Sequence, residues 1–341
     1  MLRVLYNQLF VTPALPSTPT PFNHRTVIIT GANTGLGLAA AHHIATGPVS
    51  KLILAVRNTE AGAAARDALL SAHAHLDPQA IEVWPLDLAS YDSVRAFAAR
   101  ATSTLDRLDV VLCNAGLATY QYSTAEAHER TITVNVISTF LLAVLLLPKL
   151  RATGELSRKQ PGPQEPEQRP VVSIVASEVH AFARFPERRA PEEKGVGIFE
   201  ALDDPDHYYG TMGERYHASK LLDVLLARAL ADRVAGDQVV VNCLNPGLCR
   251  SQLSREMDTA LVRGVLHLLG RTLEVGGRTL VAAAAAGRES HGQYMSNGEL
   301  APHELSSFVT SDDGRKTQQR VWEELSQILE KIQPGVMQNV R

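Results

Sequence analysis

The chain has 341 residues, 45% of them hydrophobic and 20% charged, which is typical of a globular protein and excludes disordered, fibrous and collagen-like chains. At this length roughly three quarters of the unfolded surface becomes buried, so the fold needs neither disulfides nor a metal for stability. The formal net charge is −3, with both signs mixed along the chain, which excludes the basic surface that nucleic-acid binding requires.

The N-terminal stretch 1–24 is apolar in places, but polar residues interrupt it and prolines follow. It lacks both the apolar core of a signal peptide and the length of a membrane-spanning helix. We therefore expect an arm that packs on the domain, and no membrane contact. The longest apolar stretch, 136–148, is also too short to cross a bilayer and predicts a buried helix.

Apolar runs of strand length alternate with helical segments along most of the chain. The predicted strands span 26–30, 51–56, 81–85, 108–113, 171–176 and 239–244, with a short one near 293–295. The predicted helices span 35–45, 59–74, 90–103, 131–150 and 216–234. Strands separated by helices of this length form crossover units, so we predict an α/β protein with a parallel sheet covered on both faces.

Two long segments interrupt this alternation. Residues 151–170 are rich in Pro, Gln, Glu and Arg, a composition that predicts an exposed loop. Residues 180–215 are too many for an ordinary loop in a compact domain. Their aromatic side chains favour partial order over the edge of the sheet, and these are Phe182, Phe185, Phe199, Tyr208 and Tyr209.

Neither the cysteines nor the histidines indicate a metal site. Cys113, Cys243 and Cys249 stand in no CxxC or zinc spacing, and so low and odd a number is typical of a reducing compartment. We therefore expect a cytoplasmic protein. His42 and His43 are adjacent, so on a helix they point about 100° apart and cannot chelate one ion together.

A glycine-rich turn, TGANTGLG, follows the first predicted strand and opens the first predicted helix. Its glycines can adopt a positive φ or admit the close approach of a ligand to the backbone. The helix N-terminus behind them offers unpaired N–H groups and a partial positive charge, which suit a pyrophosphate. The residues that we expect at the cofactor phosphates are Thr30, Gly31, Asn33, Thr34, Gly35, Leu36 and Gly37.

The spacing G-x-x-x-G-x-G of this turn resembles that of the short-chain dehydrogenase/reductase family, and the resemblance covers most of the chain, residues 26–295. It implies a nicotinamide dinucleotide cofactor and one doubly wound (Rossmann) α/β domain with a mainly parallel, seven-stranded sheet. We expect that domain at 25–300, with insertions at 151–170 and 180–215, between an N-terminal arm at 1–24 and a C-terminal helical extension at 301–341.

The end of the second predicted strand indicates which dinucleotide binds. NAD enzymes usually carry an acidic residue there, whereas a basic residue suits the 2′-phosphate of NADP. The strand here ends in AVRN without a carboxylate, and the Arg57 guanidinium can donate two hydrogen bonds to a phosphate. We therefore predict NADP(H). Asp87 and Leu88, in PLDLAS after the third strand, match the adenine-binding position of the family.

Two further loops resemble cofactor-binding segments of the family. Asn114, Ala115 and Gly116 resemble its NNAG motif, which lines the adenine ribose, and Cys113 replaces the first Asn of that motif. The segment 245–251 resembles its PG-x-x-x-T loop, which orients the nicotinamide carboxamide. The residues of this loop that we expect at the cofactor are Pro246, Gly247 and Ser251, in which Ser251 keeps the hydroxyl of the usual Thr.

Tyr216 and Lys220 lie four residues apart in YHASK, so on a helix they share one face. A free phenol has a pKa of about 10, and a nearby ammonium together with an oxidised nicotinamide is expected to lower it. Tyr216 can then protonate an alkoxide during reduction or accept the alcohol proton during oxidation. The remaining N–H donors of Lys220 can hold the nicotinamide ribose.

Ser177 and Asn135 complete a catalytic set by the same resemblance. Ser177, just past the fifth strand, resembles the serine that hydrogen-bonds the substrate carbonyl and stabilises developing charge. Asn135, in TVNVIST, resembles the asparagine that holds a water linking the lysine to solvent. An Asn among aliphatic neighbours costs stability unless it is hydrogen-bonded, which supports a specific role.

The segment after the PG loop indicates the substrate class. Its apolar residues form either a lid over the substrate, as in the family, or a helix packed on the core, and they are Leu253, Met257, Leu261, Val262, Leu266 and Leu268. A lid that faces the aromatic insertion favours a bulky apolar ketone, aldehyde or alcohol over a sugar phosphate. The layout resembles the retinol-dehydrogenase-like and fungal secondary-metabolism ketoreductase branches of the family.

We predict an NADPH-dependent carbonyl reductase in which Tyr216 donates the proton. An NADP-dependent alcohol dehydrogenase working in the oxidative direction uses the same residues and stays an alternative. A cofactor-binding protein with redox-neutral chemistry or none is a third, although the complete set of four catalytic candidates argues against it. The long helices that carry Asn135 and Tyr216 form dimer faces in many relatives of the family, so we also predict a homodimer.

Overall fold

The computed structural model describes residues 6–8, 10–14, 21–159, 169–205, 212–250, 264 and 269–341. Its main sheet has the strand order β10-β9-β8-β7-β4-β1-β2-β3, and all neighbouring strands are parallel except β9 and β10. The strands are β1 Thr26–Thr30, β2 Lys51–Val56, β3 Ile81–Pro85, β4 Val110–Cys113, β7 Val171–Val175, β8 Val240–Asn245, β9 Tyr294–Ser296 and β10 Glu299–Leu300.

This strand order confirms the predicted doubly wound α/β fold. The chain runs outward from β1 through β2 to β3, returns to β4 on the other side of β1, and then continues through β7, β8 and β9. The direction of winding therefore reverses between β1 and β4, which is where ligands bind in folds of this kind. The seven predicted strands are all present, and the eighth strand, β10, has only two residues, too few to produce a periodic signal in the sequence.

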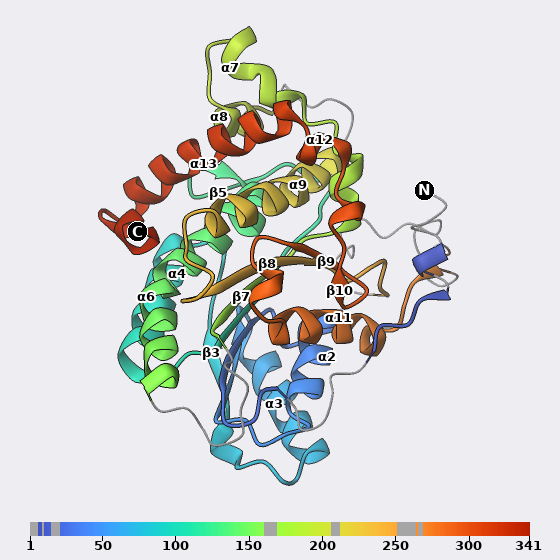
Figure 1. Cartoon of the computed structure of the whole chain (residues 1–341), viewed down its shortest axis with the longest axis vertical. Helices are drawn as coiled ribbons and strands as arrows, with labels where there is room; N and C mark the ends of the chain where they lie inside the picture. The colour runs from blue at the N-terminus through green and yellow to red at the C-terminus, as the bar shows by residue number, and fades with distance from the viewer. Residues whose placement is uncertain are drawn as a thin grey trace.

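Helices cover both faces of the sheet (Figure 1). One layer contains α2 Gly35–Ile44, α3 Thr59–Ala72 and α11 Leu273–Ala285, and the other contains α4 Tyr91–Thr104, α6 Ser138–Lys159 and α9 Met212–Ala231. Alternate side chains of β1 face the two layers, because Val27 and Ile29 pack with α2 and α11 whereas Ile28 packs with α6 and α9. Burial on both faces explains why the strands are continuous apolar runs.

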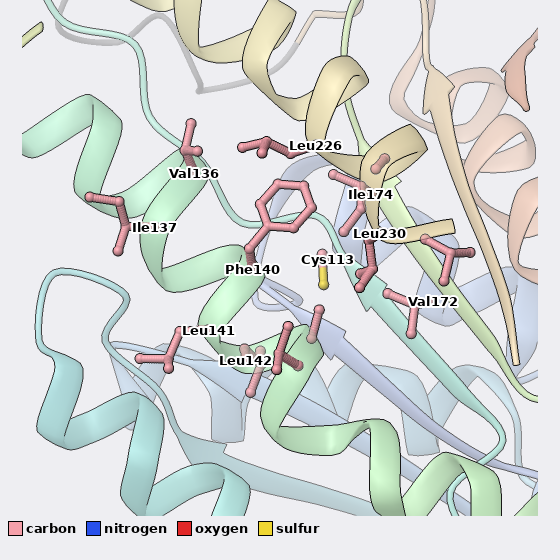
Figure 2. Close-up of a cluster of buried hydrophobic side chains, with 14 of the residues drawn as sticks. Cys113, Val136, Ile137, Phe140, Leu141, Leu142, Val172, Ile174, Leu226 and Leu230 are labelled. Atoms are coloured by element: carbon pink, nitrogen blue, oxygen red, sulfur yellow. The ribbon is translucent and has the colours of Figure 1, made fainter. Parts of the chain in front are cut away.

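Phe140 on α6 shows how the second layer is attached to the sheet. Its fully buried ring lies among Leu226 and Leu230 of α9 and Ile174 of β7 (Figure 2). Burial of a side chain of this size stabilises the fold by about 1.5–3 kcal/mol. This cluster therefore holds α9, the helix that carries Tyr216 and Lys220, in a fixed position over the sheet.

The helix α6 is longer than the sequence predicted. The composition of 151–170 predicted a loop, but the helix continues to Lys159, so that prediction is wrong for its first half. Tertiary contacts explain the difference: the Thr153 hydroxyl accepts the Leu108 N–H at 2.8 Å, and Gly154 packs against Pro170. Residues 160–168 lie outside the described residues.

The segment 180–215 folds mainly into short helices in its described part. Phe185 and Phe199 are buried there, whereas Phe182 is exposed, and Tyr208 and Tyr209 lie outside the described residues.

Short elements also connect the long helices and strands in the described part of the chain before the C-terminal layer. They are η1 Pro78–Ala80, β5 Thr124–Ala125, β6 His128–Glu129, α5 Arg130–Ile132, η2 Thr133–Ile137, η3 Glu178–Phe182, η4 Pro186–Arg189, α7 Ala190–Glu193, α8 Ile198–Asp203 and η6 Arg288–Ser290.

The C-terminal residues form a helical layer over α9 (Figure 1). The helix α13, Asp312–Ile332, presents Val321, Trp322, Leu325 and Leu329 to the core shared with α6 and α9. This layer covers parts of both helices from which the sequence predicted a homodimer. The remaining C-terminal elements are η7 Pro302–Glu304, α12 Ser307–Thr310 and η8 Val336–Val340.

One helical stretch among the described residues, Arg130–Lys159, is long and apolar enough to cross a membrane by length and composition. Inside the protein, 89% of its most apolar window is buried, as is usual for a core helix. The burial agrees with the sequence-based interpretation of 136–148 as a buried helix.

Candidate active site

The turn between β1 and α2 leaves a space that fits a pyrophosphate. Gly31 and Gly35 adopt φ values of 66° and 60°, which other residues rarely tolerate. A Cβ added at Gly37 would lie 2.5 Å from the Gly31 carbonyl oxygen, so only glycine fits there, whereas one at Gly35 meets no atom within 4 Å. The side chain of Thr34 makes no hydrogen bond to the first turn of α2. The N–H groups of the first turn of α2 are therefore left to bind an anion.

Hydrogen bonds join this turn to the end of β4. The Thr30 hydroxyl accepts the N–H groups of Asn114 and Ala115, both at 2.9 Å, and the Asn114 amide donates to the Thr30 carbonyl at 2.8 Å. Gly116 follows close to the catalytic candidates, because a Cβ there would lie 3.1 Å from Asn135 Oδ1. The structure thus brings the two predicted cofactor segments, 30–37 and 114–116, side by side.

The predicted adenine end of the site lies along β2 and β3. Arg57 is exposed directly after β2, next to the start of α3, which Asn58 caps by accepting the Ala61 N–H. The Asp87 carboxylate accepts the Ala89 N–H through Oδ1, and Leu88 is buried. Arg57, Asp87 and Leu88 therefore all lie at the carboxyl edge of the sheet.

The predicted nicotinamide loop follows β8 at the same edge. Pro246 is buried, and Gly247 adopts a φ of 78°. The Asn245 side chain accepts the N–H groups of both Gly247 and Glu178, so it ties the ends of β8 and β7 together. Ser251 and the six apolar residues of the lid candidate lie outside the described residues.

The N-terminal arm binds this loop, which the sequence did not predict. The Gln8 amide donates to the carbonyls of Leu248 and Leu269 at 2.7 and 2.8 Å and accepts the Leu248 N–H at 3.0 Å. Buried Arg271 donates to the Asn7 carbonyl at 2.7 Å and to the loop at the Pro246 carbonyl. The arm therefore holds together the two stretches of chain that flank residues 251–268.

The catalytic candidates meet beside this loop. Lys220 Nζ lies 5.9 Å from the centre of the Tyr216 ring, one helical turn away on α9. A side-chain hydrogen bond joins the Ser177 hydroxyl to the Tyr216 phenol. Lys220 donates to the Val175 carbonyl at 2.8 Å and to the Asp223 carboxylate at 2.9 Å. Asp223 is a contact that the sequence analysis missed.

Asn135 occupies the middle of a π-helical turn, Thr133–Ile137, a distortion that is frequent at functional sites. Its side chain accepts the Leu117 N–H at 2.9 Å and donates to the Leu117 carbonyl and the Ser219 hydroxyl, both at 3.0 Å. Every polar atom of this buried amide is thus paired. The contact to Ser219 also links η2 to α9 within the catalytic YHASK segment.

The pKa of the Tyr216 phenol is raised above its ordinary value. Burial is the main cause, because it disfavours the phenolate, and the Asp223 carboxylate adds to it. Lys220 and the hydrogen bond with Ser177 lower the pKa, as the sequence led us to expect, but burial and Asp223 outweigh them. At neutral pH the phenol is therefore a proton donor.

Comparison with known proteins identifies the family to which this chain belongs. A family model described as short chain dehydrogenase matches residues 25–157. The short chain dehydrogenase/reductase dmxR8 of Cryptosporiopsis sp. is 42% identical over 98% of this chain and 99% of its own length. The short-chain dehydrogenase anuD of Penicillium roqueforti is 42% identical over 98% of this chain and 84% of its own length. The chain belongs to the short-chain dehydrogenase/reductase family.

Solved structures share the fold of this short-chain dehydrogenase/reductase. The carbonyl reductase Sniffer of D. melanogaster superposes with a TM-score of 0.57 at 18% identity, over 81% of this chain and 98% of that one. The NADPH-bound carbonyl reductase from chicken fatty liver gives 0.58 at 18% identity, over 82% and 98%. At these identities the likeness concerns the fold alone.

The two histidines near the site of this short-chain dehydrogenase/reductase differ in their surroundings. His180 is buried, its Nδ1 lies 2.8 Å from the Ser177 carbonyl, and its Nε2 accepts the Ser306 N–H. It therefore links η3 to the C-terminal layer. His217 is half-buried, 3.7 Å from the Glu214 carboxylate. Within the described ranges, no group of three or more His, Cys, Asp or Glu residues could hold a metal ion.

Replacement of Gly37 by Ala tests the phosphate-binding turn. The new Cβ would overlap the Gly31 carbonyl and the Asn114 amide, and overpacking of this kind costs about 1–3 kcal/mol. We expect cofactor binding to weaken by roughly 5- to 150-fold, measured by fluorescence titration of the reduced dinucleotide. Gly335→Ala, which strains a turn at the other end of the chain, is the control and should leave affinity unchanged. Equal affinities for Gly37→Ala and wild type would contradict the assignment.

Replacement of Gln8 by Ala tests the contact between the arm and the nicotinamide loop. The change removes three hydrogen bonds to Leu248 and Leu269, each with a net value of about 0.5–1.5 kcal/mol. We expect both a lower thermal unfolding midpoint and roughly tenfold weaker cofactor binding, followed by calorimetry. Tyr6→Ser, which removes an exposed ring from the same turn, is the matched control. Unchanged binding in Gln8→Ala would show that the arm only adds stability.

Proposed function

We propose that this protein is an NADPH-dependent carbonyl reductase that acts on a bulky, apolar ketone or aldehyde. The observation that carries the proposal is the position of the Tyr216 phenol, which hydrogen-bonds the Ser177 hydroxyl, lies beside Lys220 and is protonated at neutral pH because burial raises its pKa. The protonated phenol can give its proton to a developing alkoxide, whereas alcohol oxidation needs the phenolate, of which little is present at neutral pH. The same geometry therefore supports reduction better than the oxidative alternative.

The chain's own residues account for binding and proton transfer. When bound, the dinucleotide supplies the hydride. The turn 30–37 would hold its phosphates, Asn114 would line the adenine ribose, and the loop at Pro246 and Gly247 would position the nicotinamide. Ser177 would donate a hydrogen bond to the substrate carbonyl, where negative charge develops during reduction. Tyr216 would then deliver the proton to that oxygen.

Arg57 supports the choice of NADPH over NADH. It is exposed at the end of β2 and followed by the N-terminus of α3, so a 2′-phosphate could meet both a guanidinium and a positive helix end. Solved structures of this fold include the NADPH-bound carbonyl reductase from chicken fatty liver and an NADP complex of RhlG from Pseudomonas aeruginosa. These observations favour NADP(H) for this chain.

The substrate class rests on the sequence of the insertions. The apolar residues of 251–268 and the aromatic residues of 180–215 favour a bulky apolar substrate over a phosphorylated sugar. The two relatives that are 42% identical to this chain come from fungi, which agrees with the resemblance of the sequence to the fungal secondary-metabolism branch of the family. We place the reaction in the cytoplasm, in line with the reduced cysteines.

Tyr216→Phe tests the proposed reaction. The variant loses the proton donor, so we expect the turnover number to fall by about 10²–10⁴-fold while the affinity for NADPH is kept. The assay follows the near-ultraviolet absorbance of NADPH with a panel of apolar cyclic ketones. Tyr120→Phe, which changes an exposed phenol, is the control and should turn over normally. Near-normal turnover by Tyr216→Phe would contradict the proposal.

Arg57→Ala tests the preference for NADPH. Loss of charge-assisted hydrogen bonds to the 2′-phosphate costs about 1.5–3 kcal/mol, which weakens NADPH binding by roughly 10- to 150-fold. The affinity for NADH should not change, because NADH has no 2′-phosphate. Arg66→Ala, which removes an arginine paired with Asp67 on α3, is the control. An equal loss for both dinucleotides would count against the assignment of Arg57.

A further inference from the structure

A buried carboxylate accompanies the catalytic candidates. Asp223 lies three residues after Lys220 on α9, and its Oδ2 accepts a hydrogen bond from Lys220 Nζ at 2.9 Å. The side chains are 1% and 8% exposed, so the pair is shielded from solvent. Water and salt therefore screen the attraction far less than they screen a surface ion pair.

The pairing limits what Lys220 offers to its other neighbours. An ammonium has three N–H donors, and two of them bind the Val175 carbonyl and the Asp223 carboxylate. One donor is left for a cofactor ribose. The charge is also compensated, because an ammonium next to a carboxylate acts on the Tyr216 phenol as a dipole and no longer as a full positive charge.

The remaining surroundings of Asp223 do not supply a competing charge. In the part of the chain that the structure describes, the Oδ1 atom of Asp223 has no hydrogen-bond partner.

Besides Lys220 and Tyr216, the titratable groups that Asp223 influences are the thiols of Cys113 on β4 and Cys243 on β8. Cys113 lies in the apolar cluster around Phe140 (Figure 2). Burial raises the pKa of both thiols to about 12, so they are neutral. Arg228 influences Cys243 from the same helix.

We infer that Asp223 is a positioning residue that neutralises Lys220 and thereby keeps the Tyr216 phenol protonated, so that carbonyl reduction persists to a higher pH and alcohol oxidation begins only at a higher pH. This inference deepens the proposed reductase function and rests on it for the direction of the reaction. The effect of Asp223 on Lys220 and Tyr216 does not depend on that function, because it involves only side chains of this protein.

The direction of the pKa shifts agrees with this geometry. Burial raises the pKa of Tyr216, Lys220 lowers it and Asp223 raises it again, with a net increase. Burial is the largest single influence on the pKa of Lys220 and lowers it, but Asp223 and Tyr216 together produce a net increase, so the amine stays charged. Burial raises the pKa of Asp223 itself to about 6, although Lys220 opposes the shift. At pH 7 the carboxylate is therefore ionised, and the pair is zwitterionic.

The test is a titration of Tyr216 in the protein without cofactor or substrate. Asp223→Asn keeps the size and an oxygen that can accept from Lys220, but it removes the charge. Tyrosines labelled with ¹³C at the ring carbons are followed by NMR from pH 6 upward, with Tyr216→Phe identifying the resonance. We expect the ionised fraction of Tyr216 at a given pH to rise about tenfold in Asp223→Asn, a shift of about one pH unit.

Controls separate charge from structure. Asp223→Glu restores a carboxylate and is expected to move the titration back toward the wild-type curve. Asp232→Asn removes an exposed carboxylate just past the end of α9 and should leave the curve unchanged. Identical Tyr216 curves for wild type and Asp223→Asn would overturn the inference. Should Asp223→Asn fail to fold, the wild-type curve decides, since a phenol that ionises below its ordinary pKa also overturns it.

A kinetic readout addresses the direction of the reaction. The rate of alcohol oxidation with NADP rises with pH as the phenol ionises, and we expect this rise to move to lower pH in Asp223→Asn by the same interval as the titration. A merely structural role would lower the rate at every pH without moving the profile, and that result would overturn the inference. Absence of ketone turnover in the wild type would instead overturn the reductase function and leave the titration result standing.

Discussion

The parallel alignment of the central strands is the constraint on which the site depends. Because β1, β4, β7 and β8 run in the same direction, their carboxyl ends meet at one edge of the sheet. Thr30 and Asn114 bond the first two of these ends together, and Asn245 bonds the last two. Backbone pairing and these side-chain hydrogen bonds thereby bring the predicted phosphate turn, Ser177 and the predicted nicotinamide loop to the same edge of the sheet.

The parts of the fold and site that the sequence predicted are those with local signals. A glycine turn between a strand and a helix, a basic residue at a strand end and a Tyr–Lys pair one helical turn apart can each be recognised in a few residues. The parts that it missed depend on contacts between distant segments. The helix α6 extends past its apolar pattern because Thr153 bonds Leu108, and Gln8 meets Leu248 across 240 residues of chain. Nothing in the composition near Gln8 indicates such a partner.

The contacts of Gln8 and Arg271 give the site a support outside the Rossmann core. The N–H and carbonyl of Arg271 bond the Leu248 carbonyl and the Arg250 N–H, so the chain before and after residues 251–268 forms a short parallel bridge. A Cβ at Gly247 would lie 2.9 Å from both Arg271 and Gln8. The glycine of the nicotinamide loop is therefore required for the packing of the arm as well as for its φ of 78°.

Asp223 connects the stability of the fold to the chemistry that we propose. An ammonium buried to the extent of Lys220 destabilises a protein unless a counter-charge and hydrogen bonds compensate it. The Val175 carbonyl and the Asp223 carboxylate supply both from within the sheet and the same helix. The compensation that permits burial also weakens the field of the lysine at Tyr216. In the proposed function, the same ion pair that makes a buried lysine tolerable thus also keeps the adjacent phenol protonated, which is the state that can deliver a proton to a reduced carbonyl.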